Sequence, residues 1–319
     1  MARDRDDATA RGRRRRRRAT LQRTAWLWVC LAPAVLLMLV FTTLPALASL
    51  AYSLYDWESF RRMEFVGLAN FRRLLSFPFQ RDFLRALGHN AEVCIVMLVG
   101  QNGLALLLAV ALASQPRGFR VYRVVTFLPV ILSLVIVGFL WQLFLNPLFG
   151  PVNKLFRTVG LPQLALAWLG DAATALPTLM VVNIWRWVGF PTLVFLAGLN
   201  AIPEEYHEAA RLDGASAWND FRFVTLPLLA PAFTIVTLLT FIGTFEWFEL
   251  PYVMGGVNGP PAGATDTLAL MFYRTAFGSV DSATSNVGLG AAISTLLFLI
   301  VGTGSVIGGL LLRRREVEL

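Results

Sequence analysis

The chain has few charged residues for its length. Of its 319 residues, 15% are charged and 56% are hydrophobic, whereas a soluble domain carries about a quarter charged residues. So apolar a chain has too little polar surface to cover a water-exposed fold. This shortage excludes an ordinary soluble domain and indicates a membrane protein.

Lysine, cysteine and histidine are also scarce. A P-loop needs a lysine behind its glycines to reach the nucleotide phosphates, but the single lysine, Lys154, stands in Val-Asn-Lys-Leu, so no Walker A site exists. The cysteines, Cys30 and Cys94, lie in apolar stretches, and the histidines, His89 and His207, are isolated. We therefore expect no metal site, no disulfide framework and no cofactor. Because clustered catalytic groups are missing too, we predict that the chain is not an enzyme.

Long apolar runs dominate the rest of the chain. A helix needs about 20 apolar residues to cross a hydrocarbon layer of about 30 Å. Continuous runs favour helices over a barrel, whose strands alternate polar and apolar residues. We predict an all-α fold, a polytopic membrane bundle of about six transmembrane helices. The expected spans are residues 26–54, 90–113, 124–145, 175–199, 227–250 and 287–312.

An arginine run, Arg13 to Arg18, precedes the first span. We interpret it as a topology signal that keeps the N-terminus in the cytoplasm, with anionic lipid as a further contact. The alternatives are nucleic-acid binding, which favours basic residues spread over a folded surface, and a cleavable signal peptide ending near Ala46-Leu47-Ala48, whose apolar region would be unusually long. The cation bias places both termini in the cytoplasm, although six arginines in the first outer loop oppose it.

The most polar stretch after the tail is residues 203–227, PEEYHEAARLDGASAWNDFRFVTLP. Local rules predict a helix that starts near Pro203, a left-handed turn at Gly214 and a second helix capped by Ser216. Such a polar pair between two spans suits insertion into a groove of a partner protein. An ordinary loop between helices is the alternative.

One spacing in this stretch is specific. Glu208-Ala209-Ala210 is followed after three residues by Gly214 and after nine more by Val224-Thr225-Leu226-Pro227. This pattern resembles the EAA signature of permease subunits of bacterial ABC importers, with Val224 in place of isoleucine. The segments FVGLANF, FLAGLNAIPEEYHEAARLDGAS and GGVNGPPAGATDTLALMFYRTAF extend the resemblance to the carbohydrate-uptake branch, the maltose and glycerol-phosphate permeases, and to the first of its two paired permeases. Met254 departs from the threonine that this family usually places before Gly-Gly.

The resemblance implies a function and a set of partners. It implies inward, ATP-driven, binding-protein-dependent translocation of a mono-, di- or oligosaccharide across the bacterial cell membrane. The implied partners are a second permease in a heterodimer, a cytoplasmic ABC ATPase dimer, an extracytoplasmic solute-binding protein, the sugar and membrane lipid, with no nucleic acid. The loop would be a coupling helix in a cleft of the ATPase, carried by Glu208, Ala209, Ala210, Asp213, Gly214, Leu226 and Pro227.

The predicted organisation follows the membrane spans. We expect one permease domain preceded by a first helix with its external loop and flanked by short tails. The expected divisions are a disordered basic cytoplasmic tail at 1–25, the first transmembrane helix and external loop at 26–85, the ABC importer transmembrane permease domain at 86–312 with its EAA loop at 203–227, and a cytoplasmic C-terminal tail at 313–319.

Candidate solute contacts come from polar and aromatic residues inside spans. Charges there, which include Glu92 and Arg186, are costly and therefore functional candidates, and sugars are held by aromatic faces and by carboxylates or amides. Glu249 and the tryptophans could instead lie at the membrane surface. Four amides, Asn90, Gln101, Asn102 and Gln142, could line the path or join helices. The predicted solute pathway comprises Asn183, Trp185, Glu246, Trp247 and Glu249.

Two alternatives stay open from the sequence. The same importer class could carry glycerol phosphate or a polyol, although a phosphate ester calls for facing cations and only Arg186 is obvious. An ion-coupled secondary transporter would need inverted repeats and midplane ion ligands, which the sequence does not display.

Overall fold

The computed structural model describes residues 28–58, 63–278 and 285–313. It divides into two units, residues 1–51 and 52–319. Among the described residues, one helix covers Trp28–Tyr52, with a π-helical turn η1 (Leu39–Thr43) before α2 (Leu44–Tyr52), whose last residue is the first of the second unit. The predicted basic tail, with its arginine run, lies outside the described residues, as do residues 314–319.

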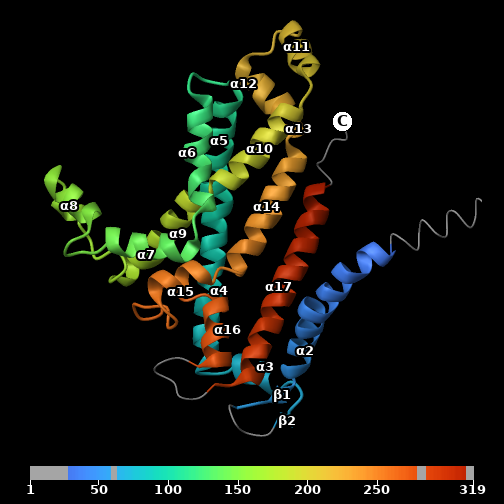
Figure 1. Ribbon diagram of the computed structural model, residues 1–319, viewed down its shortest axis with the longest axis vertical. Helices are drawn as coiled ribbons and strands as arrows, with labels where there is room; N and C mark the ends of the chain where they lie inside the picture. The colour runs from blue at the N-terminus through green and yellow to red at the C-terminus, as the bar shows by residue number, and fades with distance from the viewer. Residues whose placement is uncertain (1–27, 59–62, 279–284, 314–319) are drawn as a thin grey trace, which may run out of the picture. The chain divides into compact units, whose positions relative to one another are not determined.

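The second unit is almost entirely helical (Figure 1). Its strands β1 (Tyr55–Asp56) and β2 (Glu64–Phe65) form a short antiparallel hairpin. The helices are α3 (Ala69–Leu74), α4 (Phe79–Val96), π-turn η2 (Met97–Gln101), α5 (Asn102–Ala113), α6 (Phe119–Ile131), α7 (Leu134–Phe144), α8 (Pro151–Thr158), 3-10 turn η3 (Pro162–Leu164), α9 (Ala172–Trp187), α10 (Gly189–Ala201), α11 (Glu204–Leu212), α12 (Ala217–Asp220), π-turn η4 (Phe221–Thr225), α13 (Leu226–Leu228), α14 (Ala230–Phe245), α15 (Glu249–Gly255), α16 (Leu268–Phe277) and α17 (Val287–Arg313).

Three helices are long and apolar enough to cross a membrane without a break: Trp28–Tyr52, Phe79–Ala113 and Val287–Arg313. Three bent pairs pass the same test together, which gives up to six spans in the described residues. The pairs are α6 with α7, α9 with α10, and the segment Ala217–Leu228 with α14. The predicted all-α bundle of about six transmembrane helices is confirmed.

The boundaries of several spans differ from the prediction. The span expected at 124–145 is bent by 99° between α6 and α7, because Leu132 and Ser133 adopt extended backbone with ψ of 139° and 131°. α4 begins at Phe79, inside the stretch expected to be an external loop. The span expected at 227–250 ends at Phe245, and α15 follows as a separate helix. Apolar composition located these segments, but it carries no information on where a helix breaks.

Small residues and interhelical hydrogen bonds hold the bundle together, as expected where lipid removes the hydrophobic drive for association. Ala105 and Ala109 of α5 are fully buried where α5 packs against α10. Asn102 of α5 and Thr240 of α14 exchange side-chain hydrogen bonds of 3.1 and 3.2 Å. Gln142 of α7 donates to two carbonyls of α15. Asn102 and Gln142 therefore join helices.

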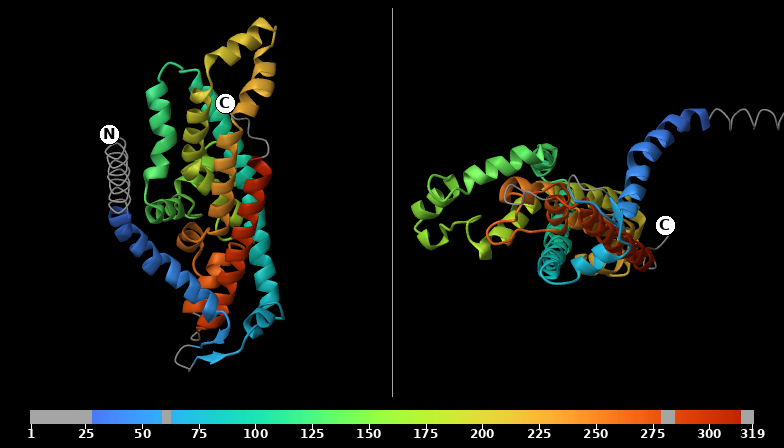
Figure 2. Two further views of the ribbon diagram at one scale, coloured as in Figure 1. Left: turned by 90° about the vertical axis from the view of Figure 1, so that its right-hand side faces the viewer. Right: turned by 90° about the horizontal axis from the view of Figure 1, so that it is seen from below.

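The ends of the second unit differ in character. The pair α11–α12 projects at one end, beside the turn between α5 and α6, whereas the hairpin and α3 lie at the opposite end (Figures 1 and 2). The C-terminal end of α17 points toward the α11–α12 end (Figure 2). The polar segment 203–227 is thus set apart from the middle of the bundle, where the cavity described below is found.

Candidate functional site

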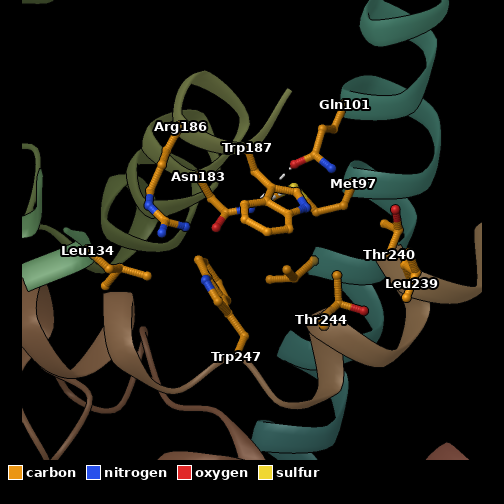
Figure 3. Close-up of a pocket in the computed structure, with 12 residues that line it drawn as sticks. Met97, Gln101, Leu134, Asn183, Arg186, Trp187, Leu239, Thr240, Thr244 and Trp247 are labelled. Carbon is orange, nitrogen blue, oxygen red and sulfur yellow. Dashed lines mark hydrogen bonds between the residues drawn. The ribbon is translucent and has the colours of Figure 1, made fainter. Parts of the chain in front are cut away.

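A cavity of about 180 Å³ lies among the central helices (Figure 3). Five elements and the break after α14 supply its lining, so the cavity depends on the packing of the bundle and not on one loop. The lining residues are Val93, Met97 and Gln101 from α4 and η2, Leu134 from α7, Asn183, Arg186 and Trp187 from α9, Leu239, Thr240, Gly243 and Thr244 from α14, and Trp247.

Two buried hydrogen-bond donors of the cavity lining have no partner among the described residues. Within the part of the chain that the structure describes, the buried Nε of Arg186 and Nε1 of Trp247 have no hydrogen-bond acceptor. Asn183 donates to Oε1 of Gln101 over 3.5 Å, at the long limit for a hydrogen bond. An unsatisfied buried donor costs about 1–3 kcal/mol. Figure 3 shows both unpartnered side chains on the border of the cavity, where the acceptor atoms of a solute would satisfy them.

The structure places the predicted pathway residues in four different surroundings. Asn183 and Trp247 line the cavity together. Trp185 is not in the lining and packs edge-to-face on Trp141, with ring centroids 5.6 Å apart. Glu246 borders a different groove, with Phe248, Phe272 and Tyr273. Glu249 is exposed at the start of α15 and is not part of the cavity lining.

Sequence reasoning missed much of the lining, although a helical signal was present. Thr240 and Thr244 are spaced i and i+4 on one face of α14, and Trp247 follows in the break after that helix. On α9, Arg186 and Trp187 follow Asn183 at i+3 and i+4, the same helical face. A search of the apolar spans for polar residues at helical spacing would have identified these residues as candidates.

The second site is the α11–α12 pair, residues 204–220. α11 ends in a Schellman motif, in which the N–H of Gly214 donates to Arg211 and that of Ala215 donates to Ala210. Gly214 has a φ of +79°, the left-handed conformation that glycine adopts without strain. Ser216 then caps α12 through the N–H of Asn219, at 3.3 Å. The local structure predicted for this segment is thus present.

Side chains of α11 and α12 fix the angle between the two helices and leave an exposed face. Nδ1 of His207 lies 3.0 Å from both carboxylate oxygens of Asp220. Leu212 is 89% exposed and Trp218 is 64% exposed. All the predicted coupling residues except the half-buried Ala210 are exposed: Glu208, Ala209, Asp213, Gly214, Leu226 and Pro227. A polar face that also presents large apolar side chains is typical of a protein-docking surface.

Comparison with known proteins identifies the family. A family model described as the inner membrane component of binding-protein-dependent transport systems matches residues 101–315, more than half of the chain. The chain belongs to this family. Among relatives of the transport family, the lactose transport system permease protein LacF of Rhizobium radiobacter is 31% identical, over 91% of this chain and 94% of that protein. The trehalose/maltose transport system permease protein MalF of Thermococcus litoralis is 31% identical, over 86% and 89%.

A solved structure has the same fold. It is the crystal structure of a bacterial ABC transporter involved in the import of the acidic polysaccharide alginate. One of its chains aligns with a TM-score of 0.78 and 21% identity, over 93% of this chain and 98% of that one. The resemblance to importer permeases is therefore confirmed, and this chain is a multi-pass membrane transport subunit.

Proposed function

We propose that this chain is the translocation subunit of an ATP-driven, binding-protein-dependent importer that passes a mono-, di- or oligosaccharide inward. The observation that carries the proposal is the cavity, where buried N–H donors of Arg186 and Trp247 lack acceptors. Sugar hydroxyl and ring oxygens are acceptors of this kind, and the indole faces suit the C–H surfaces of a sugar. The names of the lactose and trehalose/maltose relatives support sugar as the cargo.

A second permease would complete the pathway. The cavity of about 180 Å³ is smaller than the usual small-molecule site of about 300–1,000 Å³. A heterodimer that places a second set of helices against this lining would enlarge the cavity to the size of a disaccharide. In this arrangement the present chain is the first of the two paired permeases.

The α11–α12 pair would transmit conformational changes of a separate ATPase to the membrane helices. The sequence has no Walker A lysine, so nucleotide hydrolysis belongs to a cytoplasmic ABC ATPase dimer. Its grooves would receive Glu208 and the exposed apolar side chains of α11 and α12, and closure of the dimer would move the helices around the cavity. Both termini then face the cytoplasm and a solute-binding protein docks at the opposite end.

A pull-down from mild detergent tests the partners. We expect the tagged wild-type chain to co-purify with an ABC ATPase and a second permease, identified by mass spectrometry. Glu208→Arg should lose the ATPase and retain the second permease. The matched control is Glu64→Arg, the same charge change on exposed β2 at the far end of the unit, which should retain both. Recovery of the wild-type chain alone would contradict the importer assignment.

Uptake by reconstituted vesicles tests the cargo and the energy source. We expect accumulation of radiolabelled lactose or maltose that depends on internal ATP and on the binding protein, and that survives collapse of ion gradients. Glycerol 3-phosphate is tested as the alternative cargo. Its phosphate would need a facing cation, and Arg186 is the one cation of the cavity lining. Uptake driven by an ion gradient without ATP would overturn the proposal.

A further inference from the structure

A buried charge cluster lies next to the cavity and outside its lining. Its centre is the carboxylate of Asp266, which is 1% exposed. Nη1 and Nη2 of Arg274 donate to its two oxygens at 2.5 and 2.6 Å. Nη2 of Arg85 lies 3.9 Å from the same carboxylate, and Nδ1 of His89 donates to the Asp266 carbonyl at 2.9 Å. We call these four residues the Asp266 cluster.

The cluster ties α4 to a distant stretch of the sequence, the loop that leads into α16 together with α16 itself. Arg85 and His89 come from α4, Arg274 comes from α16, and Asp266 ends the loop that leads into α16. Asn90, which follows His89, accepts from the N–H of Leu268 at 2.9 Å and donates to the Thr244 carbonyl at 2.7 Å. The start of α16 is thus held against α4 by charges and amides together.

The next residue joins this cluster to the cavity. Thr267 donates its hydroxyl proton to the carbonyl of Trp247 at 3.0 Å and caps α16 by accepting from Leu270. Trp247 lies in the break between α14 and α15, where helical hydrogen bonds do not fix the backbone. The bond from Thr267 is therefore an external constraint on the residue that carries the unpartnered indole N–H into the cavity.

We propose that Asp266 is a positioning residue for transport: through Thr267 it sets the place of Trp247 in the cavity without itself touching the solute. The expected effect on transport rests on the proposed function, whereas the placement of Trp247 does not. Loss of the Asp266 charge would leave the half-buried Arg274 without this counter-ion, which destabilises the junction. The loop would shift, and with it the backbone of residues 244–248.

Hydrogen exchange of the detergent-solubilised protein tests the placement without any solute. We expect Asp266→Asn to raise amide exchange of residues 244–248 at least five-fold. Exchange of residues 105–112 in α5, which belong to a separate part of the core, should not change. The matched control is Asp82→Asn, because Asp82 also pairs with Arg85, at 2.9 Å, but is 45% exposed and does not contact Asp266. The control should match the wild type.

A second pair of variants keeps the test decisive if Asp266→Asn does not fold. Thr267→Val keeps the side-chain shape and removes the hydroxyl, so exchange of residues 244–248 should rise. Thr267→Ser restores the hydroxyl and should return exchange to the wild-type level. Wild-type exchange at 244–248 in Thr267→Val, or an equal rise along the whole chain, would overturn the proposal.

The effect on transport is measured separately. In vesicles, Asp266→Asn should change the ratio of maltose to lactose uptake rates at least three-fold, because a ratio does not depend on how much transporter is assembled. An unchanged ratio together with raised exchange would overturn the functional part of the proposal. Absence of sugar uptake in the wild type would instead overturn the proposed function, and the exchange result would still decide the positioning role.

Discussion

Trp247 presents a buried indole N–H that has no acceptor among the described residues. If a cargo oxygen is its acceptor, Trp247→Phe removes one hydrogen bond and keeps an aromatic face. A neutral hydrogen bond contributes about 0.5–1.5 kcal/mol, so we expect sugar transport to fall about 2- to 10-fold in reconstituted vesicles. Trp185→Phe is the control, because Trp185 packs on Trp141 outside the cavity. Equal losses in both variants would remove Trp247 from the pathway.

Gly290 marks a close crossing of α16 and α17. A Cβ at this position would lie 2.6 Å from Cβ and 2.9 Å from Cα of Ala276, so the helices would have to separate. We expect Gly290→Ala to lower the apparent melting temperature in detergent, since overpacking costs about 1–3 kcal/mol. Gly302→Ala on the same helix meets nothing within 4 Å and should melt at or above the wild-type temperature. A wild-type melting curve for Gly290→Ala would show that the crossing can relax.

Single residues also show the limit of sequence reasoning about the site. Asn183 and Trp247 were predicted as solute contacts and lie together in the cavity. Trp185, two residues after Asn183, points elsewhere because neighbours in a helix are turned by about 100°. The spacing of Asn183 and Arg186 indicates one polar face of α9, but the sequence alone does not show whether that face meets a cavity or another helix. Only the packing of α4, α9 and α14 decides it.

At the scale of elements, the α11–α12 pair follows local rules. Its cap, its left-handed glycine and its carboxy-terminal turn depend on neighbouring residues, so they could be predicted from the sequence. The break between α6 and α7 could not, because a single polar residue, Ser133, does not distinguish a bent span from a straight one. Its bend of 99° depends on tertiary contacts, such as those of Gln142 with α15.

The turn at Gly214 gives a test of the α11–α12 pair as a rigid unit. A side chain here would meet nothing within 4 Å, and only the φ of +79° resists substitution. We expect Gly214→Val to abolish sugar uptake while the protein stays in the membrane, because a β-branched residue disfavours left-handed backbone. Gly214→Asn should retain more uptake, since asparagine tolerates this conformation. Normal uptake by Gly214→Val would show that the angle of the pair does not matter.

At the scale of the whole molecule, cations have different surroundings at the two ends of the second unit. Toward the hairpin end, several arginines are paired, as Arg73 is with Glu58 and Arg274 with Asp266. At the end that carries the α11–α12 pair, Arg117 in the turn between α5 and α6 and Arg120 and Arg123 at the start of α6 have no acidic residue near them in the sequence. The cation count treats arginines in ion pairs and unpaired arginines alike. Counted in this way, the arginines at the hairpin end oppose the orientation that the other cations favour.

Labelling of introduced cysteines tests that orientation. Gln163 is exposed between α8 and α9, and Ala217 is exposed at the start of α12, so the bent pair α9–α10 is the one crossing between them. In a background with Cys30 and Cys94 replaced by serine, a membrane-impermeant maleimide should label Gln163→Cys in intact spheroplasts and Ala217→Cys only after lysis. Labelling of both positions before lysis would mean that α9 and α10 do not cross the membrane together. The reverse pattern would place the α11–α12 pair outside, where it could not meet a cytoplasmic ATPase.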